Sequence, residues 1–282
     1  MIVNAFTCTG PYAILIMLGV KRVENRSMCP SPVKGRCAVS CSKSFCKEEF
    51  GNFVQWASRA LSADQFAMIP AWSDVADWPG KVVGCCDYEA GTARPESAPC
   101  QGVLLPVPRG EGAAGTMLWD EGYPYWWKLS EVVSFDRTIP CRGNVGMWQM
   151  PPALAAQVTA TDSLERSVGE VIATADDAEQ VFRAAVSIAG GNEGFFVLPL
   201  DAERRVLKAP ILVALGETTT TIVDPGEVCS AALGVGAKAV VVAHNHPSGN
   251  TTPSVQDKVL TAELTRLGSS LGVEVLDHLI IG

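Results

Sequence analysis

Two histidines and an aspartate in the C-terminal part of the chain have the spacing of ligands to one metal ion. His244 and His246 directly follow the apolar stretch 239–243, and Asp257 comes eleven residues after His246. Strand side chains alternate, so histidines at positions i and i+2 of a strand end point to the same side. Asp257, one turn into a following helix, can reach back with an oxygen. Two imidazoles and one carboxylate leave a fourth position open, as in catalytic zinc sites, where a bound water ionises near neutral pH and becomes a nucleophile.

A purely structural interpretation exists for each of these residues. Ser254 and Asp257 also fit a capping box, in which the serine caps the helix and the acid pairs with the first turn. A His-x-His pair is a weak signal by itself, because an exposed loop histidine is usually only solvated. The joint pattern favours the metal: two of the chain's three histidines, a strand-to-loop position and a following carboxylate occur together. We therefore predict a Zn²⁺ ion held by His244, His246 and Asp257, with Ser254 able to serve both as cap and in the site.

The pattern His244-x-His246-x10-Asp257, with Ser254 three residues before the acid, resembles the JAMM (MPN+) zinc metallopeptidase signature. The wider sequence over 176–282, which ends in LDHLIIG, is similar to the RadC-like branch of that family. The resemblance implies an α/β sandwich with a mixed sheet and a hydrolase that cleaves a peptide or isopeptide-like bond in a protein or peptide substrate. It also implies a catalytic glutamate at the start of the first core strand, where Glu193 stands.

The expected roles of Glu193 and Ser254 are catalytic. Glu193 would accept a proton from the zinc-bound water and pass it to the leaving amine; the alternative is a solvated acid at the end of a loop. A second functional interpretation is a non-catalytic or nuclease-type protein, since RadC relatives carry a loose association with DNA repair. Residues 151–282 hold 8 Lys and Arg against 16 Asp and Glu, which weakens direct nucleic-acid binding by this part.

Alternating helix-like and strand-like segments must position these residues. Hydrophobic periodicity predicts helices over 176–189, 227–235 and 254–271 and strands over 195–200, 206–214, 239–243 and 273–281. Strands and helices that alternate in this way indicate an α/β domain over 176–282. Residues 151–175 have few turn signals and weak periodicity, so we expect a linker that can include a short helix.

The first 150 residues resemble a different family, the ASCH domains, on the segments PYA at 11–13, GVKRVENR at 19–26, GR at 35–36 and IPCRGNVGMW at 139–148. This resemblance implies a PUA-like β-barrel of α+β type whose cleft binds RNA or a nucleotide. Lys21, Glu24 and Arg26 would line the cleft, and an aromatic such as Trp148 could stack on a base. The alternatives are a surface ion pair between Lys21 and Glu24 and a core position for the tryptophan. ASCH amidohydrolases carry Thr where this chain has Glu24, so a binding module is favoured over an enzyme.

The local pattern of the first half is that of short strands and loops around a few helices. We expect helices over 12–18 and 48–61, a strand over 36–42, a long loop over 87–115 and further strands over 126–150.

The composition of the chain limits the class of protein to which it can belong. The 282 residues are 48% hydrophobic and 18% charged, which excludes general disorder and predicts two globular domains. The longest apolar run, 13–20, is far shorter than the roughly 20 residues that span a bilayer. We expect no membrane partner and a soluble, cytoplasmic protein.

The ten cysteines form no C-x-x-C pair, so we interpret them as small buried hydrophobic residues. A weaker alternative is a metal site at Cys37, Cys41 and Cys46.

Overall fold

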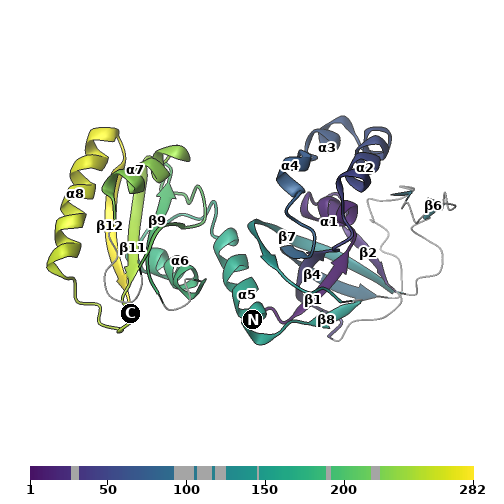
Figure 1. Cartoon of the computed structure of the whole chain (residues 1–282), viewed down its shortest axis with the longest axis horizontal. Helices are drawn as coiled ribbons and strands as arrows, with labels where there is room; N and C mark the ends of the chain where they lie inside the picture. The colour runs from purple at the N-terminus through teal and green to yellow at the C-terminus, as the bar shows by residue number, and fades with distance from the viewer. Residues whose placement is uncertain are drawn as a thin grey trace. The chain divides into compact units, whose positions relative to one another are not determined.

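The computed structural model describes residues 1–26, 32–91, 105–106, 116–117, 125–144, 146–188, 192–216 and 223–282. These residues form two compact units, Met1–Val158 and Thr159–Gly282 (Figure 1). No helix in the described ranges combines the length and the apolar character that crossing a membrane would require.

The first unit is built on a six-stranded mixed sheet with the strand order β2-β7-β4-β3-β1-β8. Its strands are β1 (Asn4–Cys8), β2 (Val23–Arg26), β3 (Lys34–Cys41), β4 (Lys81–Gly91), β7 (Tyr125–Pro140) and β8 (Met147–Gln149), and a separate pair consists of β5 (Leu105–Pro106) and β6 (Thr116–Met117). Its helices are α1 (Gly10–Met17), α2 (Lys47–Ala60), α3 (Ala63–Ala67) and α4 (Trp72–Val75). The predicted helices over 12–18 and 48–61 and the strand over 36–42 are thus confirmed.

The expected closed barrel is not found among the described residues. In the sheet, β2 pairs with β7 and β8 pairs with β1, so these two short strands form opposite edges and do not close on one another. A barrel requires that the first and last strands pair. One core cluster lies instead between the sheet and helices such as α1 and α2, where Phe6, Ile14 and Phe53 are buried; a second one includes Ala5 and Phe135. The first unit is therefore a layered α/β structure over the residues described.

Two further expectations for the first half differ from the structure. Strand β4 continues to Gly91, so the predicted loop over 87–115 begins later; apart from β5, its remainder lies outside the described residues. Within the predicted linker, helix α5 covers Pro152–Arg166, and the division between the two units falls inside this helix. Ala155 and Val158 of α5 are buried in the first unit's core, whereas Leu164 is buried in the second unit's core. Apolar residues at helical spacing thus make this segment a helix where weak periodicity had suggested a linker.

Most of the described cysteines are buried, as predicted. Cys8, Cys37, Cys41, Cys85, Cys86 and Cys229 are buried, Cys141 is half-buried and Cys46 is exposed. Burial raises the pKa of the Cys41 thiol to about 12, so this thiol is protonated at neutral pH. Cys29 and Cys100 lie outside the described residues.

The second unit is a four-stranded sheet with the order β10-β9-β11-β12. Its strands are β9 (Glu193–Leu200), β10 (Ile211–Gly216), β11 (Ala239–Asn245) and β12 (Glu274–Ile281), and its helices are α6 (Ala175–Ile188), α7 (Pro225–Gly234) and α8 (Val255–Leu271). Strand β11 is antiparallel to β9 and parallel to β12, so the sheet is mixed. The predicted α/β organisation of this part is confirmed.

One predicted strand of this unit is too long. Instead of a strand over 206–214, the chain makes an isolated bridge at Val206, bends at Lys208 and Ala209, and enters β10 only at Ile211. Pro210 stands between the bend and the strand, and proline has no N–H to donate to a ladder. The apolar pattern of 206–214 therefore overestimates the length of this strand.

The central strand β11 is buried along its whole length, and its two faces meet different helices. Val241 and Ala243 pack in one core with α6, whereas Val240 and Val242 pack in another with α7 and α8. Figure 1 shows α6 on one side of this sheet and α8 on the other. Because the side chains alternate, His244 continues the series of Val240 and Val242 and faces α8.

Strand β12 contains a β-bulge that changes which residues face α8. Val275 pairs with Val240, but the register shifts at the next position, where Asp277 pairs with Val241 and His278 with Val242. Without the extra residue, Asp277 would lie opposite Val242 and His278 would face α6. The bulge thus places His278 on the sheet face that carries His244, and re-aiming a side chain is a common use of bulges near functional sites.

The tight packing of α8 against the start of β12 predicts the effect of a small substitution. A Cβ added at Gly268 would lie 2.6 Å from the backbone oxygen of Val273. We expect Gly268→Ala to destabilise the second unit, although alanine is the better helix former by about 1 kcal/mol. At Gly234 an added Cβ meets nothing within 4 Å, so Gly234→Ala is the matched control and should leave stability unchanged or slightly raised. Urea denaturation of both variants tests this; equal midpoints would contradict it.

Candidate metal centre

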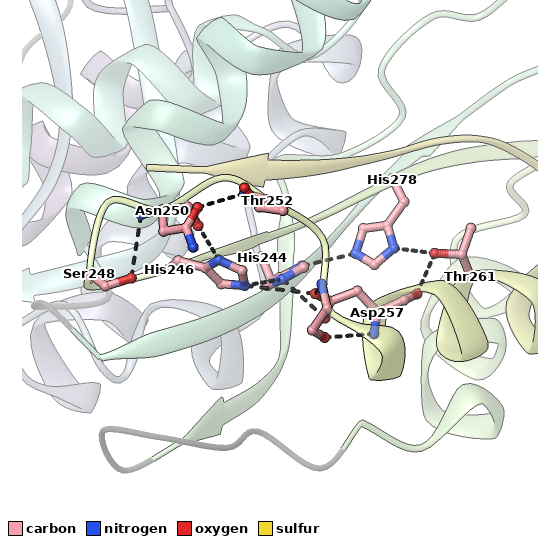
Figure 2. Close-up of polar contacts among 9 residues, drawn as sticks. His244, His246, Ser248, Asn250, Thr252, Asp257, Thr261 and His278 are labelled. Atoms are coloured by element: carbon pink, nitrogen blue, oxygen red, sulfur yellow. Dashed lines mark hydrogen bonds and ion pairs between the residues drawn. The ribbon is translucent and has the colours of Figure 1, made fainter.

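The three predicted ligands converge on one point. The Nε2 atoms of His244 and His246 are 2.9 Å apart, and Asp257 lies 3.4 Å from His244 Nε2 through Oδ1 and 3.9 Å from His246 Nε2 through Oδ2 (Figure 2). Ligand atoms of a tetrahedral zinc at about 2.0–2.1 Å are separated from one another by about 3.3 Å. The three observed separations bracket that value. In the part of the chain that the structure describes, this is the only group of His, Cys, Asp and Glu residues found to converge in this way, so the alternative site at Cys37, Cys41 and Cys46 is not supported.

Asp257 owes its position to the N-terminus of α8. Ser254 is the N-cap: its Oγ accepts a hydrogen bond from the Asp257 N–H at 3.1 Å, and Asp257 Oδ2 accepts one from the Ser254 N–H at 2.7 Å. The capping box that the sequence suggested is therefore present. It does not compete with a metal-binding role, because Oδ1 of the same carboxylate faces His244. The cap holds one oxygen and leaves the other directed at the histidines.

His246 is oriented by the loop that follows it. Its Nδ1 is hydrogen bonded to the backbone oxygen of Asn250, and a carbonyl oxygen can only accept, so Nδ1 carries the hydrogen. In the neutral ring Nε2 then presents a lone pair toward His244 and Asp257. The backbone N–H of His246 donates to Ile281 of β12 at 2.9 Å, which fixes the start of the loop to the sheet.

The electrostatic surroundings of His244 and Asp257 favour the protonation states that metal binding requires, a neutral imidazole and an ionised carboxylate. Burial lowers the pKa of His244 to about 4, the neighbouring His278 adds to this shift, and Asp257 partly opposes it. At neutral pH this imidazole is therefore uncharged and able to bind a metal. For Asp257, burial would raise the pKa, but hydrogen bonds from Ser254 and the nearby histidines bring it below its usual value. The carboxylate is therefore ionised.

The predicted base Glu193 is the first residue of β9, next to the strand that carries His244. Phe195 lies opposite His244 in the antiparallel β9–β11 pairing, and its ring stacks on the imidazole with 6.1 Å between ring centroids. Glu193 is two residues before Phe195, so the same register brings it level with His246 on the same face of the sheet. The role of Glu193 as a base stays a prediction that this register supports.

Asn245, between the two histidines, was not identified from the sequence. Its buried side-chain amide accepts a hydrogen bond from the Gly194 N–H at 2.8 Å and donates one to the Asn192 backbone oxygen at 2.9 Å. These two bonds bracket Glu193 and attach the start of β9 to the segment that carries the ligands. A buried amide that satisfies two backbone groups is a rigid connection, because breaking it leaves polar groups unpaired. The position of the residue between the two histidines was the available signal.

His278 was also missed as a functional residue. Its Nε2 lies 2.9 Å from His244 Nδ1, and its Nδ1 lies 2.7 Å from the Thr261 hydroxyl (Figure 2). The sequence signal was present, since His278 is the third of only three histidines. What the pattern could not show is the bulge that turns it toward His244.

The candidate nucleotide-binding residues of the first unit are only partly described. Lys21 Nζ and Glu24 Oε2 form a 2.8 Å ion pair, both side chains are buried, and Lys21 lies 5.2 Å from the centre of the Tyr12 ring. The surface ion pair that the sequence left open is therefore wrong, because the pair is buried. Arg26 is the last residue of β2, and its side chain lies outside the described residues.

Trp148 is a core residue and not a stacking platform. Its side chain is buried, and its Nε1 donates to Thr7 Oγ1 at 3.3 Å. A base could not reach the ring face without opening the core. The suggestion that Trp148 stacks on a base is therefore wrong.

Comparison with known proteins finds a similarity in the second unit. Residues 172–282 match the family described as RadC-like JAB domain. This match supports the JAB part of the sequence resemblance; the ASCH resemblance of residues 1–150 remains a prediction.

Several similar proteins carry the name UPF0758 protein. One from Rubrobacter xylanophilus is 36% identical over 121 residues, which are 43% of this chain and 52% of the relative. One from Symbiobacterium thermophilum is 43% identical over 90 residues, 32% of this chain and 38% of the relative. One from Methanosarcina mazei is 41% identical over 91 residues, 32% and 39% of the two chains. The matched region spans about half or less of each of these three relatives, and the shared name states no activity.

The ligand geometry predicts the outcome of removing one ligand. We expect the purified chain to hold one zinc ion, and His246→Ala to hold much less, because two remaining ligands bind zinc far more weakly than three. Lys258→Ala, an exposed change beside Asp257, should keep the ion and serves as control. Metal analysis by inductively coupled plasma mass spectrometry measures both. An unchanged zinc content in His246→Ala would refute the assignment of His246.

Proposed function

We propose that the RadC-like JAB domain is a zinc-dependent hydrolase of the JAMM metallopeptidase type. The observation that carries the proposal is the convergence of two imidazole nitrogens, 2.9 Å apart, with the Asp257 carboxylate, whose Oδ1 lies 3.4 Å from His244 Nε2 and whose Oδ2 lies 3.9 Å from His246 Nε2. His244, His246 and Asp257 would hold the ion. Bound there, zinc would supply the Lewis acidity that polarises a carbonyl group and makes water a nucleophile near neutral pH.

Glu193 is proposed as the proton carrier. It starts β9, level with His246, and the Asn245 amide holds the backbone on both sides of it. A carboxylate in this place can take a proton from the attacking water and deliver it to the departing amine, which needs one to leave. The same residue thus acts first as base and then as acid.

Ser254 is proposed to stabilise the carbonyl oxygen of the substrate. Its Oγ accepts from the Asp257 N–H, and this acceptor role leaves the hydroxyl hydrogen available for donation. The residue is exposed at the N-terminus of α8, where the helix dipole also favours developing negative charge. The Ser254 hydroxyl can therefore accept the hydrogen bond of the helix cap and donate one to the substrate oxygen at the same time.

The excess of acidic side chains in this part of the chain favours a peptide or isopeptide-like bond over a phosphodiester as the bond that is cleaved. Residues 151–282 carry 16 acidic against 8 basic side chains, which opposes the approach of a polyanion. Amide bonds are uncharged, and an amine leaving group needs the proton that Glu193 would supply. A protein or peptide is therefore the proposed substrate, and a nuclease is the competing outcome.

Replacing Glu193 separates catalysis from metal binding. Because Glu193 is a proposed proton carrier and not a ligand, Glu193→Gln should keep its zinc and its thermal stability but lose hydrolysis by a factor of about 100 or more. The assay is cleavage of a peptide and isopeptide library by the zinc-loaded chain, with nucleic-acid cleavage measured in parallel. Glu203→Gln, an exposed change in a turn, is the control. Full activity of Glu193→Gln would move the role to another residue, and cleavage of nucleic acid alone would favour the nuclease.

For the first unit we propose binding of a nucleotide or single-stranded RNA at Lys21, Glu24 and Arg26. The supporting observation is the buried pair of Lys21 and Glu24 against the Tyr12 ring. Taking two charges out of water is costly, and such pairs recur at binding sites as well as in structural networks. A buried ammonium and carboxylate suit a base edge or a single phosphate better than a long backbone.

This second proposal is tested on the full chain. Lys21→Ala should weaken binding of labelled single-stranded RNA and of nucleoside monophosphates, measured by fluorescence polarisation and calorimetry, and the remaining affinity should depend less on salt. Arg22→Ala, an exposed neighbour, should bind normally. Since Lys21→Ala leaves a buried carboxylate unpaired, the double variant Lys21→Met with Glu24→Gln removes both charges and checks that folding is kept. Normal binding by the folded double variant would contradict the proposal.

A further inference from the structure

The third histidine of the chain contacts a proposed metal ligand without belonging to the converging group. We propose that His278 and Thr261 form a hydrogen-bond relay that holds His244 in the tautomer whose Nε2 is free to bind the metal. The inference rests on the proposed zinc site and assigns two positioning residues to it. His244 Nδ1, His278 Nε2, His278 Nδ1 and Thr261 Oγ1 follow one another at 2.9 and 2.7 Å across the ring of His278 (Figure 2).

The direction of the relay follows from its far end. The Thr261 hydroxyl lies 2.6 Å from the backbone oxygen of Asp257, and a carbonyl oxygen can only accept. The single hydroxyl hydrogen of Thr261 is therefore used in that bond. In the contact with His278, Thr261 Oγ1 must accept, so Nδ1 of His278 carries a hydrogen and donates it.

The rest of the relay is then fixed by the chemistry of imidazole. A neutral imidazole has one N–H, so His278 Nε2 has a lone pair and accepts from His244 Nδ1. His244 carries its own hydrogen on Nδ1, and its Nε2 presents a lone pair toward His246 and Asp257. His246 reaches the same state through the Asn250 carbonyl. Both imidazoles thus direct lone pairs to one point, an arrangement that is unfavourable unless a cation lies between them.

Two packing features hold the relay in place. The bulge in β12 brings His278 opposite Val242, on the face of the sheet that α8 covers, and Thr261 lies on α8 one turn after Asp257. The ring of Phe195 stacks on His244 and meets the His278 ring edge-on, with 5.4 Å between the latter centroids. Both imidazole rings therefore lie against an apolar surface that offers no hydrogen-bond partner, and ring rotation would break the bonds at Nδ1 and Nε2.

Loss of the Thr261 acceptor would release the tautomer. In Thr261→Val the Nδ1–H of His278 faces a methyl group, so His278 gains by moving its hydrogen to Nε2 and donating to His244 Nδ1. His244 would then carry its hydrogen on Nε2, which zinc has to displace. Outer hydrogen-bond partners of metal-bound histidines typically contribute 10–100-fold to metal affinity.

The decisive experiment compares two threonine substitutions on one helix. Zinc dissociation constants of the full chain are measured by competition with a chelating fluorophore. Thr261→Val should bind zinc about 10–100-fold more weakly than the unchanged chain, and Thr261→Ser should restore binding to within about threefold. Thr265→Val is the matched control. The Thr265 hydroxyl, one turn further along α8, donates to the Thr261 backbone oxygen at 2.8 Å. The control variant therefore loses the same kind of side-chain-to-backbone hydrogen bond, but outside the relay. Equal affinities of Thr261→Val and Thr265→Val would overturn the relay.

A second readout does not depend on metal. Ring ¹⁵N chemical shifts distinguish protonated from unprotonated imidazole nitrogens, and three histidines make the assignment simple. In the metal-free chain at neutral pH, Nδ1 of His244 and of His278 should be protonated, and Thr261→Val should move the hydrogen of His244 to Nε2. A protonated Nε2 on His244 in the unchanged chain would overturn the relay even if zinc binds. Relay tautomers in a chain that binds no zinc would instead refute the proposed function and leave the relay standing.

Discussion

A buried imidazole has to satisfy two ring nitrogens, and for His244 this requirement organises the structure around it. His244 is only 3% exposed and follows five apolar residues, 239–243, in β11. Burying a polar group without a partner costs several kcal/mol, so the neighbouring elements must supply partners on both sides of the ring. Strand β12 supplies a partner for Nδ1 through His278. At Nε2, His246 and Asp257 present only acceptor atoms, so the proposed metal ion would be the second partner of the ring.

Several polar side chains of this centre therefore serve folding and chemistry together. The capping box satisfies two N–H groups at the start of α8 and also orients the Asp257 carboxylate. The Asn245 amide satisfies the backbone on both sides of Glu193 and also joins β9 to the ligand-bearing segment. Thr261 caps a carbonyl within the helix and also receives the His278 N–H. Because each bond has both roles, substitutions here need readouts that separate stability from metal binding.

The local features of this unit could be predicted from its sequence, whereas the features that depend on long-range pairing could not. The run AVVVA, the His-x-His pair and the Ser254-x-x-Asp257 box each depend on neighbours within one strand or turn, so spacing alone was enough to predict them. The bulge in β12 depends on pairing with β11, and simple alternation along 273–281 would have turned His278 toward α6. The first unit shows the same limit, since whether β2 and β8 close a barrel depends on pairings between distant segments. Pro210, inside the predicted strand 206–214, was a local signal against a continuous strand, but the apolar run outweighed it in the prediction.

The charge balance of the centre bears on the bond that the proposed hydrolase would cleave. Two neutral imidazoles and one carboxylate would leave a divalent cation with a net charge of about +1, which favours a carbonyl oxygen and a deprotonated water as further ligands. This local positive charge lies in a part of the chain with twice as many acidic as basic side chains, 16 against 8. A polyanion would meet repulsion before it reached the ion, whereas an uncharged amide would not. Local attraction for an oxygen combined with general repulsion of anions therefore supports the peptide or isopeptide-like bond over the phosphodiester.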